Sequence, residues 1–420
     1  MTRTLKSWIP IAEDNDFGIE NIPFGIVQTA DGTSLATRIG DTVVKLNVLA
    51  ANGFFDHLEI EDLWVFSANV LNPFIDLGKP LTNAVRGRLQ LLFSDESTEL
   101  STQPNLCRQA FIEAGNANML MPVAVGDYTD FYSSIEHATN VGIMFRDPAN
   151  ALLPNWKHLP VGYHGRSSSI VVSGTNFHRP KGQTKPAEDA EVVFGPTRQL
   201  DFELEMAFIS CGPTELGQSI TVSEAEEHIF GLVLFNDLSA RDIQKWEYVP
   251  LGPFLSKSFA SIVSPWVVTL EALAPFRVEG PGQIPAPLPY LLQSGANNFD
   301  IELKVLLKPA LAAEKLICRT NFKYMYWSMF QQLAHQTIAG CNINTGDLYG
   351  SGTISGPTPD SYGSMLELCW KGTKPLTMAD GTQRVFLHDN DTVVMKACAR
   401  KGTLRVGFGE CVTTVLPAKP

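Results

Sequence analysis

The chain has 420 residues, of which 44% are hydrophobic and 18% charged, and this is typical of a folded protein with two or three domains. Lys and Arg total 32 against 44 Asp and Glu, so the formal net charge is −12. A surface of that sign repels phosphate backbones and anionic lipids, which argues against nucleic acid and membrane partners. An anionic small substrate would need its own local Arg or Lys.

The amino-terminal segment Met1–Phe17 lacks an apolar core of signal-peptide length, and the apolar run Ile229–Phe235 is too short to span a bilayer. The seven cysteines form no C-x-x-C pair. An odd number of scattered cysteines indicates buried thiols in a reducing compartment, so we expect a cytoplasmic protein.

Residues 1–118 are expected to form a first unit. Short β-like runs at Phe24–Val27 and Asp41–Leu46 are separated by turn residues, and helical spacing of apolar residues follows over Leu81–Phe93. The pattern predicts a small β-rich domain with helices, in which we identify no residues for chemistry.

Residues 119–420 are expected to form a second, larger unit in which β runs dominate, with one clear helix over Lys323–Ile338. Because regular helices do not separate the strands, a doubly wound sheet or a TIM barrel is disfavoured. The fold class is therefore mostly β with some α, with a large mixed or antiparallel β-roll or sandwich. The expected strands are Ser169–Ser173, Gln199–Ser210, Ile229–Asn236, Trp266–Leu270, Asp300–Leu307, Met365–Trp370, Thr392–Ala399 and Thr403–Phe408.

Acidic and apolar residues alternate through Leu200–Phe208, which places Glu203 and Glu205 two positions apart. On a β-strand this spacing puts both carboxylates on one face, about 7 Å apart, and the apolar residues on the other. Two ionised carboxylates beside an apolar layer need a compensating positive group. A hard divalent cation, Mg²⁺ or Ca²⁺, suits that role, and the alternative is an edge strand with a solvated acidic face.

A further carboxylate follows the apolar run Phe230–Phe235, which predicts a fully buried strand. Asp237 stands where this strand gives way to a helix, and Ser239–Asp242 has the form of a capping box that opens it. Asp237 is therefore a candidate ligand, or itself a helix cap.

The segment Gly126–His137 is dense in polar and aromatic groups and adds Asp130 as a carboxylate and His137 as a candidate base. A lone histidine is also often a packed or surface residue. Zinc is disfavoured because no Cys/His set has ligand spacing. The carboxylates suited to a Ca²⁺ or Mg²⁺ site completed by water or substrate oxygens are Asp130, Glu203, Glu205 and Asp237.

Three residues of the helix after Asp237, namely Arg241, Gln244 and Tyr248, have the spacing of one helix face. They would project a cation and two donors toward whatever the metal holds, and Lys257 adds a second positive donor. The alternative for each is a solvated helix face or a surface lysine.

The common nucleotide, zinc-protease and serine-hydrolase signatures are missing: G-x-G-x-x-G, G-x-x-x-x-G-K-[ST], H-E-x-x-H and G-x-S-x-G do not occur. Instead, long runs of the sequence resemble the fumarylacetoacetase (fumarylacetoacetate hydrolase) family over nearly the whole chain. The runs that carry the resemblance are Asp130–Ser134 with His137–Asn140, Leu159–Arg166, Asp201–Glu205, Asn236-Asp237, Ser239–Gln244, Trp246–Phe254 and Ser351–Gly356.

The resemblance implies an N-terminal SH3-like β-domain, a C-terminal mixed β-sandwich roll and a homodimer. It also implies hydrolysis of a small 1,3-diketo acid, fumarylacetoacetate, to fumarate and acetoacetate, the last step of tyrosine and phenylalanine catabolism. Two rivals are an acylpyruvate hydrolase, decarboxylase or hydratase of the same superfamily acting on a smaller keto acid, and a non-catalytic scaffold with a structural ion.

The resemblance further implies roles for individual residues. His137 becomes the water-activating base, oriented by Glu367, and Arg241, Gln244 and Lys257 become the oxyanion-stabilising group. The implied ligands of Mg²⁺ or Ca²⁺ are Asp130, Glu203, Glu205 and Asp237, with Lys257 and Ser261 near a second, Mg²⁺ site. The implied substrate contacts are Tyr132, Arg146, Tyr163, Gln244, Tyr248 and Thr353.

The chain departs from the family pattern at two places. Ala260-Ser261 replaces Gly-Thr, which keeps a hydroxyl at the second metal site, and Leu238 replaces Trp beside a ligand, where we expect an effect on packing.

Overall fold

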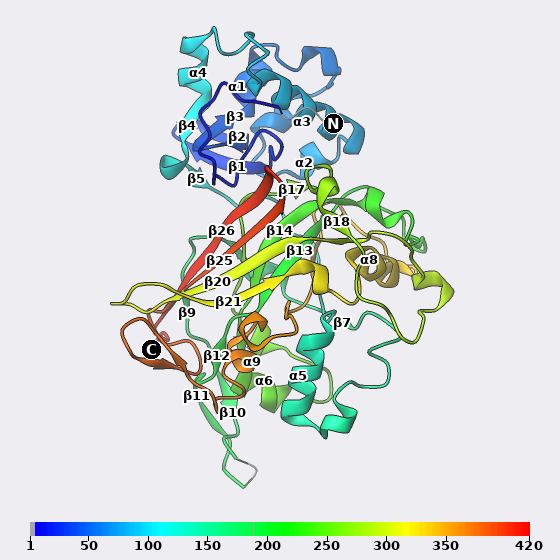
Figure 1. Ribbon diagram of the computed structural model, residues 1–420, viewed down its shortest axis with the longest axis vertical. Coiled ribbons are helices and arrows are strands. Elements are labelled where there is room, and N and C mark those ends of the chain that lie inside the picture. The colour runs from blue at the N-terminus through cyan, green and yellow to red at the C-terminus, as the bar shows by residue number, and fades with distance from the viewer. Residues whose placement is uncertain (1–4, 188) are drawn as a thin grey trace.

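The computed structural model describes residues 5–187 and 189–420, so the first four residues of the predicted N-terminal unit lie outside the description. The N-terminal part, blue to cyan in Figure 1, covers one end of a larger body of long strands. Within the described ranges, no helix combines the length and apolarity needed to cross a bilayer.

The N-terminal part is built on a five-stranded antiparallel sheet with the order β4-β3-β2-β1-β5. Its strands are β1 (Phe24–Thr29), β2 (Gly32–Ile39), β3 (Thr42–Lys45), β4 (Phe111–Glu113) and β5 (Asn118–Met119). The helices are α1 (Leu46–Ala51), α2 (Asn72–Ile75), α3 (Lys79–Phe93) and α4 (Pro104–Ala110). The expected helix over Leu81–Phe93 is confirmed as α3.

The larger body contains an eight-stranded mixed sheet with the order β7-β6-β22-β13-β14-β16-β8 and β17 paired to β14. Strand β6 runs parallel to β22, and β8 runs parallel to β16. The partners in each pair are far apart in sequence, so the sheet brings distant segments of the chain together. Its strands are β6 (Tyr128–Phe131), β7 (Gly162–His164), β8 (Ile170–Val172), β13 (Leu204–Ser210), β14 (Ile229–Asp237), β16 (Ser261–Val263), β17 (Val268–Thr269) and β22 (Leu348–Gly350).

A second, five-stranded sheet with the order β21-β20-β25-β26-β9 lies against the first, and β14 contacts β25 and β26. Alternate residues such as Leu204 and Met206 of β13, and Leu303 and Val305 of β20, share one hydrophobic cluster, which is the core of this sandwich. The strands of this sheet are β9 (Phe177–His178), β20 (Ile301–Lys308), β21 (Lys315–Asn321), β25 (Thr392–Lys401) and β26 (Leu404–Leu416).

The opposite face of the eight-stranded sheet is buried as well. Ala207 and Ile209 of β13, and Val233 and Phe235 of β14, belong to a cluster that also contains the apolar residues of the N-terminal part. Since both faces are covered, β14 is buried at all nine positions, as its unbroken apolar run predicts.

Short pairs and helices complete the body. The paired strands are β10 (Lys181–Thr184) with β11 (Val193–Pro196), β12 (Leu200–Asp201) with β15 (Ser239–Ala240), β18 (Arg277–Val278) with β19 (Asn298–Phe299), and β23 (Leu376–Thr377) with β24 (Gln383–Arg384). The helices are α5 (Ile135–Phe145), α6 (Arg241–Glu247), α7 (Leu270–Leu273), α8 (Met329–Thr337) and α9 (Met365–Leu368).

The expected mostly-β class is confirmed, but two local predictions are wrong and the bounds of a third element differ. Met365–Trp370 was expected to be a strand and instead contains the helix α9, whose N-cap Ser364 accepts a hydrogen bond from the Glu367 amide. Ser239 does not cap α6: it lies in β15 and donates to the Asp237 carbonyl oxygen, and Ala240 takes the N-cap position. The helix expected over Lys323–Ile338 is shorter, since α8 begins at Met329.

Candidate active site

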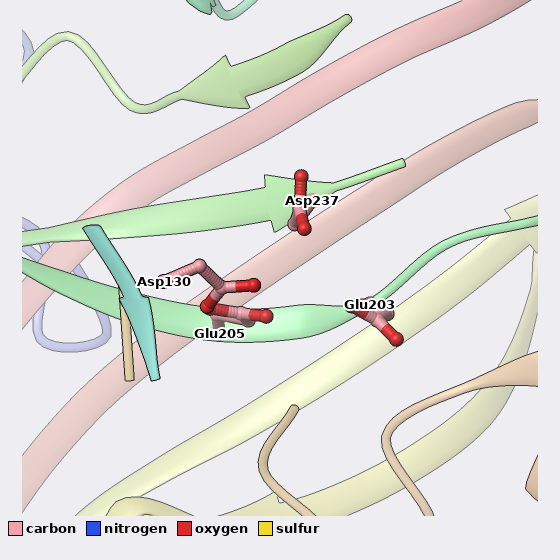
Figure 2. Close-up of side chains that lie close together, drawn as sticks. All are labelled: Asp130, Glu203, Glu205 and Asp237. Atoms are coloured by element: carbon pink, nitrogen blue, oxygen red, sulfur yellow. The ribbon is translucent and has the colours of Figure 1, made fainter. Parts of the chain in front are cut away.

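Four buried carboxylates meet at the ends of three strands of the eight-stranded sheet. Asp130 comes from β6, Glu205 from β13 and Asp237 from β14, while Glu203 lies just before β13 (Figure 2). Each offers an oxygen atom, and these oxygens all lie within 4.8 Å of one another. The spacing argument that placed Glu203 and Glu205 together, with Leu204 in the core, is confirmed.

The positive charge at this cluster is concentrated on one side. The Lys257 ammonium is hydrogen-bonded to both Glu203 and Asp237, and Arg241 forms an ion pair with Glu203 over 2.7 Å. Lys257 is buried, which excludes the alternative of a surface lysine. These contacts lower the pKa of Glu203, although its burial acts in the opposite direction. Glu203 is therefore held as a carboxylate.

Asp130 and Glu205 lie on the uncompensated side. Burial, together with the neighbouring carboxylates, raises the pKa of both groups. Asp130 Oδ1 and Glu205 Oε1 are buried and, within the described residues, form no hydrogen bond. Glu205 Oε2 accepts one from the Gly352 amide at 3.0 Å. Buried carboxylate oxygens without partners suit a hard divalent cation, so the residues present fit such an ion.

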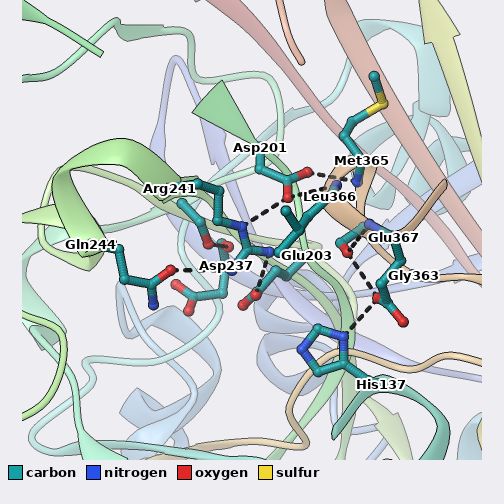
Figure 3. Close-up of polar contacts among 12 residues, drawn as sticks. His137, Asp201, Glu203, Asp237, Arg241, Gln244, Gly363, Met365, Leu366 and Glu367 are labelled. Atoms are coloured by element: carbon teal, nitrogen blue, oxygen red, sulfur yellow. Dashed lines mark hydrogen bonds and ion pairs between the residues drawn. The ribbon is translucent and has the colours of Figure 1, made fainter. Parts of the chain in front are cut away.

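A second pair of groups lies beside the cluster. His137 Nδ1, on α5, is 2.6 Å from Glu367 Oε2, on α9, and both side chains are buried (Figure 3). Asn140 Nδ2, Ser355 Oγ and Ser364 Oγ also donate to the Glu367 carboxylate. Burial acts to raise the pKa of Glu367, but the contacts with His137, Asn140 and Ser364 outweigh it and lower this pKa. In a neutral imidazole, an ionised Glu367 would accept the Nδ1 proton and leave the Nε2 atom of His137 as an acceptor.

Arg241 links several groups through its planar guanidinium. Its Nε donates to Asp201 Oδ2 at 2.9 Å, and its Nη1 donates to Gln244 Oε1 at 3.3 Å. Because Oε1 of Gln244 is used in this way, its NH₂ group remains available as a donor.

Several residues expected as substrate contacts or second-site ligands lie next to these groups. Tyr163 donates its hydroxyl proton to Asp237 Oδ2 at 3.3 Å, and Ser261 Oγ donates to Asp237 Oδ1 at 2.9 Å. The Tyr132 ring packs edge-on against His137, with ring centroids 5.2 Å apart. Thr353 is buried in the loop after β22, next to Gly352, whose amide binds Glu205.

Two expected residues are not brought into the cluster. Tyr248 follows α6 and its side chain is 52% exposed, so a contact from it beside Arg241 and Gln244 stays a prediction. Arg146 is exposed, and its guanidinium donates to the Ala151 carbonyl oxygen at 2.7 Å.

The sequence reasoning missed Asp201 and the donors to Glu367. Asp201 precedes Glu203 and Glu205 in the same two-residue alternation, and this spacing could have identified it as a further carboxylate of the site. Asn140, three residues after His137, lies on the same helical face. For Ser355 and Ser364 we find no comparable signal in the sequence.

Comparison with known proteins identifies the relatives of this chain. The family described as "Fumarylacetoacetate (FAA) hydrolase C-terminal" matches residues 128–416, and "Fumarylacetoacetase N-terminal" matches residues 20–122. The chain is 52% identical to the fumarylacetoacetase of Dictyostelium discoideum, over 99% of this chain and 98% of that protein. It is 51% identical to the fumarylacetoacetase of Homo sapiens, over 98% of this chain and 99% of that protein.

A solved structure shares the fold. The fumarylacetoacetate hydrolase from the psychrophilic Exiguobacterium antarcticum superposes with a TM-score of 0.52 and 17% sequence identity, covering 95% of this chain and 100% of that one. The family matches and the identities of 52% and 51% to two fumarylacetoacetases confirm the resemblance seen in the sequence.

The raised pKa values of Asp130 and Glu205 predict that a cation and protons compete for the cluster. A carboxyl group whose pKa is higher in the folded state stabilises the metal-free fold at low pH, and this contribution is lost as the pH rises through the raised pKa. We therefore expect the increase in melting temperature caused by Ca²⁺ or Mg²⁺ to grow from about pH 5 to pH 8. Thermal unfolding with and without the cation measures this, and a pH-independent increase would contradict it.

Gly350 should be needed for cation binding although it is not a ligand. A Cβ atom at this position would lie 2.9 Å from Glu205 Oε2 and 3.0 Å from Asp130 Oδ1. We expect Gly350→Ala to weaken cation affinity about 5-fold or more, since overpacking costs about 1–3 kcal/mol. Isothermal titration calorimetry measures the affinity. The control is Gly195→Ala in β11, where a Cβ meets nothing within 4 Å, and equal affinities of the two variants would refute the prediction.

Proposed function

The chain belongs to the fumarylacetoacetase family, and we propose that it hydrolyses the C–C bond of fumarylacetoacetate, a 1,3-diketo acid, to give fumarate and acetoacetate. The observation that carries this proposal is the buried His137–Glu367 pair, formed by residues 230 positions apart, beside four carboxylates that fit a divalent cation. A base next to a cation site suits the hydrolysis of a 1,3-diketone, because the base can activate water and the cation site can stabilise the enolate leaving group.

In this proposal His137 Nε2 takes a proton from a water molecule, which attacks the carbonyl carbon on the fumaroyl side. Glu367 holds the imidazole in the tautomer that has Nε2 free. Collapse of the tetrahedral adduct breaks the C–C bond, and the released acetoacetate carbanion takes up the proton that His137 carries. The new carboxylic acid ionises, so each turnover releases one proton to solvent at neutral pH.

The oxyanion of the tetrahedral adduct needs fixed donors, and we assign Arg241, Gln244 and Lys257 to it. Arg241 and Lys257 are buried cations, and the Gln244 NH₂ group is not used by its contact with Arg241. One donor to an oxyanion is typically worth about 3 kcal/mol of transition-state stabilisation.

We propose that a bound Mg²⁺ and/or Ca²⁺ ion completes the site, held by the four carboxylates. When bound, such an ion supplies Lewis-acid polarisation of the diketone oxygens and takes up enolate charge. Ser261 and Lys257, both in contact with Asp237, are assigned to a second, Mg²⁺ position. The substrate contacts proposed are Tyr132, Arg146, Tyr163, Gln244, Tyr248 and Thr353, with Arg146 as a clamp for a substrate carboxylate.

We further propose a cytoplasmic homodimer with an SH3-like N-terminal domain over residues 1–118 and a catalytic domain over residues 119–420. In support of a reducing compartment, all seven cysteines are free thiols. In support of the division, the two family descriptions match residues 20–122 and 128–416 separately.

The purified protein should consume fumarylacetoacetate in a cation-dependent reaction. We expect loss of the diketone absorbance, with equimolar fumarate and acetoacetate formed, in Mg²⁺ or Ca²⁺ and not in EDTA. No turnover by the folded, cation-loaded protein, together with activity on a smaller acylpyruvate or other keto acid, would favour the superfamily alternative. No turnover of any of these substrates, with a melting temperature that EDTA still lowers, would favour a structural ion.

His137→Ala should remove catalysis and leave cation binding intact. General base catalysis contributes about 10²–10⁴-fold, so we expect kcat to fall by at least about 100-fold. The calorimetric affinity for Ca²⁺ should stay at the wild-type value because His137 is not one of the four carboxylate residues. Loss of cation binding in this variant would contradict the division of roles.

A further inference from the structure

We propose that Asp201 is a positioning residue that fixes Arg241 relative to the His137–Glu367 pair. This inference rests on the proposed function, because it assigns Asp201 to the geometry of that site. Asp201 is fully buried and lies outside the four-carboxylate cluster, and none of the proposed catalytic steps uses it.

The contacts of the Asp201 carboxylate reach both halves of the site. Its Oδ2 accepts hydrogen bonds from Arg241 Nε at 2.9 Å and from the Leu366 amide at 3.1 Å. Its Oδ1 accepts one from the Met365 amide at 2.7 Å. Figure 3 shows Asp201 between the Arg241 guanidinium and the first residues of α9. One side chain thus binds the proposed oxyanion donor and the helix that carries Glu367.

The backbone of Asp201 is fixed independently of these contacts. Its strand β12 pairs with β15, with Asp201 opposite Ser239, two residues before Arg241. The next residue, Phe202, is buried in the sandwich core. Glu203 then forms a β-bridge with Ser364, the N-cap of α9. The carboxylate is therefore presented from a rigid support to both partners.

Helix α9 depends on this carboxylate. The first amides of a helix have no intrahelical partner, and Asp201 binds two of them, those of Met365 and Leu366. Glu367 follows directly and is bonded to His137 at 2.6 Å. A shift or rotation of α9 would therefore move the Glu367 carboxylate relative to the imidazole.

Arg241 depends on Asp201 as well. Burial raises the pKa of Asp201, and the guanidinium is the main group that opposes this. Without Asp201, Arg241 keeps the ion pair with Glu203 and its contact with Gln244, but the Nε position loses its acceptor. The plane of the guanidinium would then be free to turn about the remaining contacts.

The test is Asp201→Asn, which keeps the size of the side chain and replaces one acceptor oxygen by NH₂. The matched control is Asp391→Asn. Asp391 is also fully buried, accepts two hydrogen bonds from Arg384 at 2.9 and 3.1 Å, and accepts one from the His388 amide at 2.9 Å. It forms the same kind of cluster without contacting His137, Glu367 or Arg241.

Two readouts distinguish positioning from a general structural role. The first is steady-state kinetics with kcat and KM determined separately. Asp201→Asn should lower kcat about 10- to 100-fold and change KM much less. The second is the nuclear magnetic resonance signal of the His137 Nδ1 proton in ¹⁵N-histidine-labelled protein, assigned by its loss in His137→Gln. We expect this signal to shift or disappear in Asp201→Asn and to remain in Asp391→Asn.

Wild-type kcat and an unchanged Nδ1 signal in Asp201→Asn would overturn the proposal. A lower kcat with an unchanged signal would also overturn it, because Asp201 would then act through Arg241 alone. The Nδ1 signal does not require turnover, so it decides the link to His137 even if the wild-type protein fails to hydrolyse fumarylacetoacetate. Failure of the proposed function is thus distinguishable from failure of this inference.

If Asp201→Asn does not fold, a second pair of variants tests the same link. Met365→Pro removes the amide that donates to Asp201 Oδ1, at the first helical position, where proline is well tolerated. Met365→Ala loses the side chain and keeps the amide. A changed Nδ1 signal and lower kcat in the proline variant only would support the inference, and equal behaviour of the two would overturn it.

Discussion

The site depends on an excess of negative charge buried where the strands β6, β13 and β14 come together. Four carboxylates share a space in which their oxygens lie within 4.8 Å of one another, while Lys257 and Arg241 compensate only the side of Glu203 and Asp237. Burying that charge is unfavourable unless a cation completes the cluster. Burial and the neighbouring carboxylates raise the pKa of Asp130 and Glu205, whereas Arg241 and Lys257 lower that of Glu203, so one cluster contains two electrostatic environments.

The sequence predicts those parts of the site that follow from local periodicity. Alternation placed Glu203 and Glu205 on one face, and an unbroken apolar run identified β14 as a buried strand ending at Asp237. Local periodicity gives a wrong prediction where contacts between distant residues determine the secondary structure. Met365–Trp370 has the composition of a strand but becomes α9, because Ser364 caps it and Asp201, more than 160 positions earlier, accepts its first amides.

The pairing of His137 with Glu367 could not be derived from spacing, since 230 positions separate the two residues. The family resemblance supplied it, and the geometry places the two groups 2.6 Å apart. The two departures from the family pattern also receive a physical account. Ser261 retains the hydroxyl that binds Asp237, and Leu238 is buried in the core cluster of the sandwich, where its contribution is packing.

Among the residues that the structure describes, the N-terminal part contributes no side chain to the site, yet the site depends on it. A strand that holds carboxylates at its end stays buried on both faces only if something covers the face away from the sandwich core. Here the apolar residues of the N-terminal part share one cluster with Phe235 of β14 and Tyr128 of β6, which lie two positions from the carboxylates Asp237 and Asp130. Because of this packing, water is kept from the strands that present the charges, and Coulombic attraction to a cation is stronger than it would be at a solvated sheet edge. The carboxylate cluster at the ends of these strands therefore depends on the apolar packing that covers one face of the sheet.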